Sequence, residues 1–168
     1  MNTPINFRQK YTVSMDMMTR LITLVLIAIT IYVVYQQIVI FLEKKEMNTI
    51  FVGAILILVL LLSIAFKPLS YILTVDNLVI KRIAGDILIA KNDIKSAELL
   101  KSGTLGTLVR GFGIGGYFGY MGSYYSSKIG WLTMYATRRD NRILITIKDD
   151  KKIIITPDET TLAAALII

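Results

Sequence analysis

Residues 21–42 read LITLVLIAITIYVVYQQIVIFL, a stretch without a single formally charged side chain. As a helix this stretch would span about 33 Å, enough to cross a hydrocarbon core of about 30 Å. Residues 49–66, TIFVGAILILVLLLSIAF, are also uncharged, and the connector 43–48 (EKKEMN) is short and polar. The pattern predicts an antiparallel transmembrane hairpin over residues 21–66, preceded by an N-terminal cytoplasmic tail of residues 1–20.

Two other interpretations of the apolar segments fit less well. A cleaved signal peptide has a shorter apolar stretch followed by a small-residue cleavage site, and the first segment has neither property. Buried core helices would need more chain to cover them, because both segments are apolar on every face. The segregation of charge away from these segments is what a bilayer demands.

The distribution of Lys and Arg predicts which side of the membrane each end occupies. Cations lie before the first apolar segment and after the second, at Arg8, Lys10, Arg20, Lys67, Lys81 and Arg82. The connector has Lys44 and Lys45, whose charge is offset by Glu43 and Glu46. We expect a multi-pass protein of the cytoplasmic (inner) membrane with both termini in the cytoplasm.

Gln36 and Gln37 are the polar exceptions inside the first apolar segment. They fall near its outer end, together with Tyr32 and Tyr35, so the favoured interpretation is an interfacial belt of amphipathic side chains. The alternative is a hydrogen bond between the two helices, worth about 0.6 kcal/mol on average.

The overall composition excludes several classes of activity. The 168 residues include no Cys and no His, which rules out a disulfide framework, a thiolate or imidazole metal site and a Ser-His-Asp triad. The net charge of +7 suits anionic headgroups, and it would equally suit a weak nucleic-acid binder. We expect no cofactor and no enzymatic activity.

From residue 70 onward, short β-branched or aromatic runs are separated by turn residues. The runs are SYILTV (70–75), LVIKRI (78–83), DILIA (86–90), WLTMYAT (131–137), RILITIK (142–148) and KIIIT (152–156). Near the end, Thr156, Pro157, Asp158 and Glu159 have the pattern of a capping box, which predicts a helix over 160–168. Residues 70–168 are therefore predicted to form an antiparallel barrel or sandwich of roughly seven strands, closed by a C-terminal helix.

Several of these features resemble a bacterial PH-domain family. They are two strands joined by Asp76-Asn77, the glycine-rich stretch RGFGIGG (110–116), the run MYAT (134–137) and the closing ITPD (155–158). The resemblance implies a pleckstrin-homology-like barrel capped by a C-terminal helix, in a family whose members are often tethered to membrane helices. The first hairpin lacks the basic loop of lipid-binding eukaryotic PH domains, so phosphoinositide recognition does not carry over.

The glycine-rich stretch 111–116 (GFGIGG) also matches G-x-G-x-x-G, the dinucleotide fingerprint. That fingerprint needs a following helix, whereas the next residues, YFGYMGSYYSS, are poor helix formers. A structural excursion between strands is the first interpretation, and contact with a partner or a lipid headgroup is the second. Base stacking on the aromatic side chains is less favoured for a membrane-tethered domain.

The residues proposed for partner or headgroup contact are Arg110, Phe112, Tyr117, Phe118, Tyr120, Lys128, Lys67, Lys81 and Arg82. The sequence thus predicts a non-catalytic, membrane-anchored PH-like binding or assembly module. The expected partners are the lipid bilayer and either another protein or a second copy of the chain, with no nucleic acid. The alternative is an accessory subunit of a larger membrane complex, with the helical hairpin as its main interface.

Overall fold

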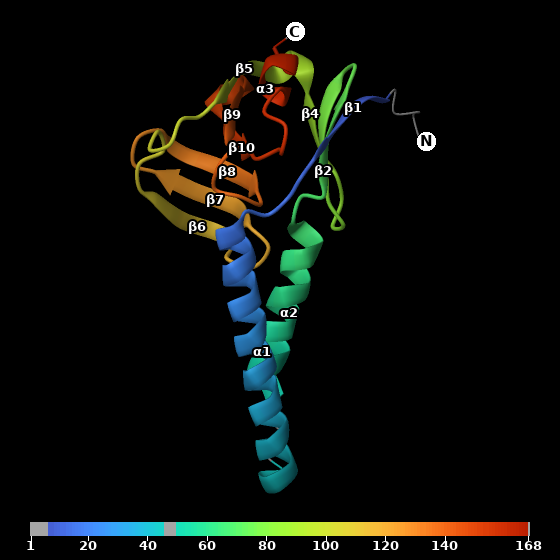
Figure 1. Cartoon of the computed structure of the whole chain (residues 1–168), viewed down its shortest axis with the longest axis vertical. Helices are drawn as coiled ribbons and strands as arrows, with labels where there is room; N and C mark the ends of the chain where they lie inside the picture. The colour runs from blue at the N-terminus through green and yellow to red at the C-terminus, as the bar shows by residue number, and fades with distance from the viewer. Residues whose placement is uncertain (1–6, 46–49, 168) are drawn as a thin grey trace.

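The computed structural model describes residues 7–45 and 50–167, as three α-helices, ten strands and two short 3₁₀ turns (Figure 1). The helices are α1 (Met17–Lys44), α2 (Ile50–Phe66) and α3 (Leu162–Ala165). The strands are β1 (Phe7–Thr12), β2 (Ser70–Thr74), β3 (Asn77–Lys81), β4 (Ile87–Ala90), β5 (Ile94–Leu99), β6 (Leu108–Gly115), β7 (Tyr120–Ser126), β8 (Gly130–Ala136), β9 (Ile143–Ile147) and β10 (Lys152–Ile155). The 3₁₀ turns are η2 (Lys91–Asp93) and η3 (Lys148–Asp150).

The two apolar segments form helices that project together from one end of the sheets (Figure 1). Helix α1 is long and apolar enough to cross a membrane, and only 6% of its most apolar window is buried within the structure. Helix α2 is a shorter apolar helix of 17 residues. It ends at Phe66, directly before the Lys67-Pro68 pair, because proline disfavours a helical conformation in the residue before it.

The strands form two sheets, one of four strands in the order β1-β2-β3-β4 and one of six in the order β5-β9-β10-β8-β7-β6. Neighbouring strands are antiparallel, except that β10 runs parallel to β8. Strand β1 belongs to the segment that the sequence analysis treated as a tail, and it pairs with β2 along its length. The helical pair is therefore inserted between two neighbouring strands of one sheet, which holds both of its ends to the domain.

The core lies between the two sheets and is built from alternating inward-facing side chains. Tyr71, Leu78, Ile80, Ile143 and Ile145 are fully buried in it. The hydroxyl of Tyr71 donates to the carbonyl of Tyr135 (2.6 Å), and accepts from the backbone N–H of Thr156 (3.1 Å). Burial raises the pKa of Tyr71, so this hydroxyl stays neutral and links the two sheets.

A second buried cluster covers the other face of the six-stranded sheet. Leu132, Met134 and Ala136 alternate along β8 and pack with Leu105 and Tyr124. The two faces of β8 differ in burial, because Trp131, Thr133 and Tyr135 are less buried than these three residues.

The predicted helix over 160–168 is wrong in its extent. Helix α3 has only four residues, and position 168 lies outside the described residues. The capping-box side chains bind elsewhere: the hydroxyl of Thr156 accepts from the N–H of Thr137 (3.0 Å), and the carboxylate of Glu159 accepts from the N–H and hydroxyl of Thr12 (3.2 and 3.1 Å). Leu162 and Leu166 are nevertheless buried in the main core, as expected for a closing element.

Candidate functional site

The linker between β1 and α1 is tied to the far end of the chain by a polar cluster. The hydroxyl and N–H of Ser14 donate to one carboxylate oxygen of Asp158 (2.6 and 3.1 Å), and Arg138 pairs with the same oxygen (2.7 Å). The carbonyl of Ser14 accepts from the hydroxyl of Thr137 (2.7 Å). These contacts fix the position from which α1 leaves the domain.

Asp16 continues this cluster as the N-cap of α1. One of its carboxylate oxygens accepts from the N–H of Thr19 (2.7 Å), and the other accepts from the N–H of Arg139 (2.8 Å). A cap of this kind satisfies one of the free N–H groups of the first helical turn. The helix is thus aimed by a side chain that also contacts the β8–β9 loop.

The electrostatics of the cluster favour ionised carboxylates. Burial, the largest contribution, opposes ionisation of Asp158, but hydrogen bonds from Ser14 and the charge of Arg138 outweigh it and hold the pKa of Asp158 below its usual range. The pKa of Asp16 is likewise lowered, because hydrogen bonds from Thr19 and Arg139 outweigh burial. The pKa of Arg138 is raised, mainly because Arg138 donates a hydrogen bond to the carboxylate of Asp140.

A lowered folded-state pKa predicts the direction of the pH dependence. Asp158 contributes stability above its unfolded pKa of about 3.9, and that contribution is lost as the pH falls through the lower folded-state value. We expect Asp158→Asn to lower the melting temperature of the full chain at pH 7, and to differ less from wild type at pH 3. Asp149→Asn, in an exposed turn, is the matched control. A penalty for Asp158→Asn that is the same at pH 3 and pH 7 would show that its charge does not matter.

The glycine-rich stretch forms the hairpin β6–β7, whose tip is residues 116–119. Figure 1 shows this tip descending between the upper ends of α1 and α2. The hydroxyl of Thr23 on α1 donates to the carbonyl of Gly116 (3.2 Å) and accepts from the N–H of Phe118 (3.0 Å). Tyr117 lies between these two contacts and is buried, with its hydroxyl 2.7 Å from the hydroxyl of Thr30. The tip therefore packs against α1 over about two turns.

Close strand approach explains the glycines of this hairpin. Gly113 and Gly122 face each other in β6 and β7, both with positive φ. A Cβ on Gly122 would overlap the carbonyl oxygen of Phe112 and lie 2.7 Å from the Cα of Gly113. After the glycines comes strand β7, whereas a dinucleotide fingerprint requires a helix at that place. Gly113 and Gly122 are accounted for by strand packing, whereas a Cβ on Gly116 would meet the side chain of Leu26 on α1 (3.1 Å).

The residues proposed from sequence for contact do not form one site. Tyr117, Phe118 and Lys67 come together at the tip, where the Lys67 ammonium lies 5.1 Å from the centre of the Phe118 ring. Arg82 lies over the rings of Phe66 and Tyr135 (5.5 and 5.7 Å). The remaining residues divide between local partners and the surface. Lys81 pairs with Asp86 (2.7 Å), Tyr120 accepts from Arg139 (2.6 Å), Lys128 donates to the carbonyl of Gly103 (3.0 Å), and Arg110 and Phe112 are exposed on β6.

The residues predicted from sequence did not include Thr23 and Thr30, which bind the hairpin tip. Thr19 is the third buried residue of α1, and its buried hydroxyl has no hydrogen-bond partner among the described residues. A signal was present, because positions i, i+4 and i+11 of a helix share one face, and hydroxyl groups on one face of an otherwise apolar helix mark a polar contact.

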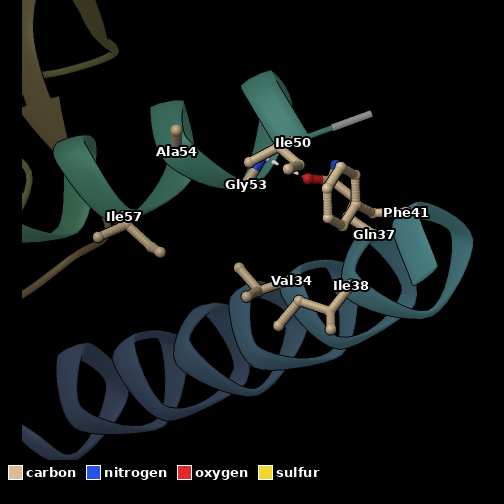
Figure 2. A pocket seen from close by; sticks show the side chains of 8 residues that line it. All are labelled: Val34, Gln37, Ile38, Phe41, Ile50, Gly53, Ala54 and Ile57. Atoms are coloured by element: carbon tan, nitrogen blue, oxygen red, sulfur yellow. Dashed lines mark hydrogen bonds between the residues drawn. The ribbon is translucent and has the colours of Figure 1, made fainter. Parts of the chain in front are cut away.

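At the far end of the helical pair, the favoured interpretation of Gln37 as part of an interfacial belt is wrong. Its side-chain oxygen accepts from the backbone N–H of Gly53 in the first turn of α2 (2.7 Å), which is the alternative helix–helix bond. Gln36 instead donates to the hydroxyl of Tyr32 (2.9 Å). Figure 2 shows the Gln37–Gly53 bond at one end of an apolar groove between the helices. The groove is lined by Val34, Gln37, Ile38, Phe41, Ile50, Gly53, Ala54 and Ile57.

The six-stranded sheet also presents an exposed aromatic pair, Tyr125 on β7 and Trp131 on β8. Their ring centres are 5.5 Å apart in an edge-to-face arrangement, and Trp131 is 63% exposed. Shallow space beside Trp131 is lined by Thr133, Lys151 and Lys152 among others. Among the described residues, no group of three or more Asp, Glu, His or Cys side chains is placed to hold a metal ion.

These elements define a small two-sheet domain joined to a pair of apolar helices by the polar cluster and the β6–β7 tip. The model of the bacterial PH domain family matches residues 69–165, more than half of the chain. The chain belongs to this family, as the resemblance seen in its sequence implied. No curated protein and no solved structure matches the chain.

Proposed function

We propose that this chain is a two-helix membrane protein that presents its PH-like domain as a non-catalytic binding or assembly module at the cytoplasmic face of the bacterial inner membrane. The observation that carries this proposal is the β6–β7 tip, which is bound to α1 by Thr23 and Thr30 and contacts Lys67, directly after α2, through the ring of Phe118. A domain attached through a flexible linker would need no such contact. Here the domain and the apolar helices form one unit, which holds its surfaces at a fixed height above the membrane.

The charge distribution supports the orientation. Arg20, Lys67 and Arg82 lie at the domain end of the helices, and Lys44 and Lys45 lie at the other end. Glu46 and the rest of 46–49 lie outside the described residues, as does the side chain of Arg8. The excess of cations at the domain end favours the cytoplasm for the domain.

The partner surface that we assign to the module is the Tyr125–Trp131 pair. A Trp with most of its surface exposed is costly to leave in water, and Trp and Tyr are the residues most enriched at the centres of protein interfaces. Lys151 and Lys152 beside the pair would favour a partner with acidic groups at the rim.

A second candidate function rests on the groove in Figure 2. An apolar groove between two membrane helices, with small residues Gly53 and Ala54 in its wall, suits the packing of a third helix. In that case the chain would be an accessory subunit of a larger complex and the helical pair would be its main interface.

Capture from native membranes separates the two candidates. The tagged full chain replaces the native copy, intact cells are crosslinked, and bound proteins are identified after purification in mild detergent. The domain variant Tyr125→Ala/Trp131→Ala should lose the partner if the domain is the binding module. The groove variant Ala54→Leu should lose it if the chain is an accessory subunit. A wild-type chain that captures no protein in stoichiometric amount would contradict both candidates.

A further inference from the structure

Phe112, at 88%, is the most exposed large apolar side chain among the described side chains of the domain. It lies on β6, the edge strand of the six-stranded sheet, where the register with β7 shifts between Arg110 and Gly113. Such a shift bends an edge strand outward and can direct a side chain away from the sheet. A single exposed apolar residue is ordinary, so its meaning depends on what lies beside it.

The height of β6 is set by the hairpin tip. The tip binds Thr23, six residues along α1 from Met17, which is about 9 Å along the helix axis. Figure 1 shows β6 as the strand of its sheet nearest the helices, at the level of the first turn of α1. Met17, the first residue of α1, is itself apolar and 87% exposed. The apolar surface of the helix therefore begins at the height of β6.

Cations lie at the same level. Arg110, two residues before Phe112, is exposed and donates one hydrogen bond to the carbonyl of Gly115 (3.3 Å), which leaves its other N–H groups for a phosphate. Arg20 is exposed in the first turn of α1. Lys67 lies at the end of α2, over the ring of Phe118 in the tip. Aromatic rings with flanking Lys and Arg are characteristic of the boundary between headgroups and acyl chains, and each nearby cation gains about 1 kcal/mol from anionic lipid.

We propose that the β6 edge is a third membrane contact of this chain, with the ring of Phe112 in the headgroup–acyl boundary and the guanidinium of Arg110 at the anionic phosphates. This inference rests on the proposed membrane anchor, and it assigns a lipid ligand to a surface separate from the Tyr125–Trp131 pair. The contact continues the apolar surface of α1 sideways beneath the sheet. It would fix the tilt of the domain as well as its height.

The chain offers a direct probe, because Trp131 is its single Trp. The variant Trp131→Phe/Phe112→Trp moves the only indole to the proposed contact, and the wild-type chain keeps it on the sheet as the matched control. Each is placed at one chain per nanodisc, with lipids brominated near the headgroup as quenchers. We expect blue-shifted emission and loss of most of the fluorescence for Trp at position 112, and little quenching of Trp131.

Lipid charge gives the second readout. Quenching at position 112 should be stronger with anionic phosphatidylglycerol than with neutral phosphatidylcholine, and Arg110→Gln should remove that difference. Water-like, unquenched emission at position 112 would overturn the inference, as would quenching that appears only in discs holding two chains. A chain that fails to enter discs would contradict the membrane anchor itself, whereas an inserted chain with an unquenched indole contradicts only the third contact.

Discussion

Replacing Leu166 by Asp should lower the free energy of unfolding of the full chain by about 4 kcal/mol or more. Leu166 is 3% exposed and lies in the core that joins the two sheets. The change removes the packing of a large apolar side chain and buries a carboxylate without a partner. Small domains are stable by only about 5–15 kcal/mol, so the variant should be largely unfolded at growth temperature.

The neighbouring residue supplies the control for this prediction. Ile167 is 63% exposed, and Ile167→Asp should change stability by no more than about 0.5 kcal/mol. Both variants are measured in detergent by urea unfolding, followed by the fluorescence of Trp131. Equal stability of the two variants would mean that the C-terminal segment does not close the core.

The second large effect is expected at Gly122, where β7 passes closest to β6. Gly122→Ala places a methyl group against the carbonyl of Phe112, so β6 must move away and the hairpin tip with it. Gly85 also has positive φ, yet a Cβ there meets nothing within 4 Å. Both substitutions cause backbone strain, so the difference between Gly122→Ala and Gly85→Ala measures the overlap, for which we expect about 1–3 kcal/mol.

The same urea titration compares these two variants. Loss of the hairpin should also release Tyr117 from α1, which raises the protease sensitivity of the tip in Gly122→Ala alone. Two variants of equal stability and equal protease sensitivity would show that β6 and β7 do not approach each other as closely as the structure has them.

Hydropathy and β-branched runs were enough to predict part of this fold. The apolar segments became α1 and α2, and the six predicted runs became β2, β3, β4, β8, β9 and β10. These elements have the strongest local signals. The helices are long segments without charged residues, and the strands are runs of Val, Ile and aromatic side chains. Over residues 70–167 the structure has nine strands, β2 to β10, where roughly seven were predicted, and it pairs β10 with β8 in parallel.

The missed strands share a physical reason. Strands β6 and β7 are rich in glycine, which has low strand propensity, and β5 (IKSAEL) carries charged and small residues. Each of these segments forms a strand because it pairs with a neighbouring strand. A short window of sequence does not show that pairing. The same holds for β1, whose partner β2 is separated from it by the whole helical pair.

The candidate site was predicted only in part for the same reason. Tyr117 and Phe118 were proposed for contact with a partner or headgroup, whereas the structure packs them against Thr23 and Thr30 of α1, about ninety residues earlier. The capping-box pattern at Thr156 was misleading because Ser14, Thr12 and Thr137, distant in sequence, compete for the same side chains. Local sequence patterns predict hydrogen bonds between residues that are close in sequence. The bonds that join α1 to the domain link residues that are distant in sequence.

Limited proteolysis of the chain in nanodiscs tests the central claim, that the hairpin tip is bound to α1 at the domain end of the two apolar helices. Chymotrypsin is added to the wild-type chain and to Thr23→Val/Thr30→Val, which keeps side-chain shape and removes both hydroxyls that bind the tip. We expect cleavage after Tyr117, Phe118 or Tyr120 to be slow in the wild type and faster in the variant. Rapid cleavage at these residues in the wild-type chain would show a free loop and contradict the account.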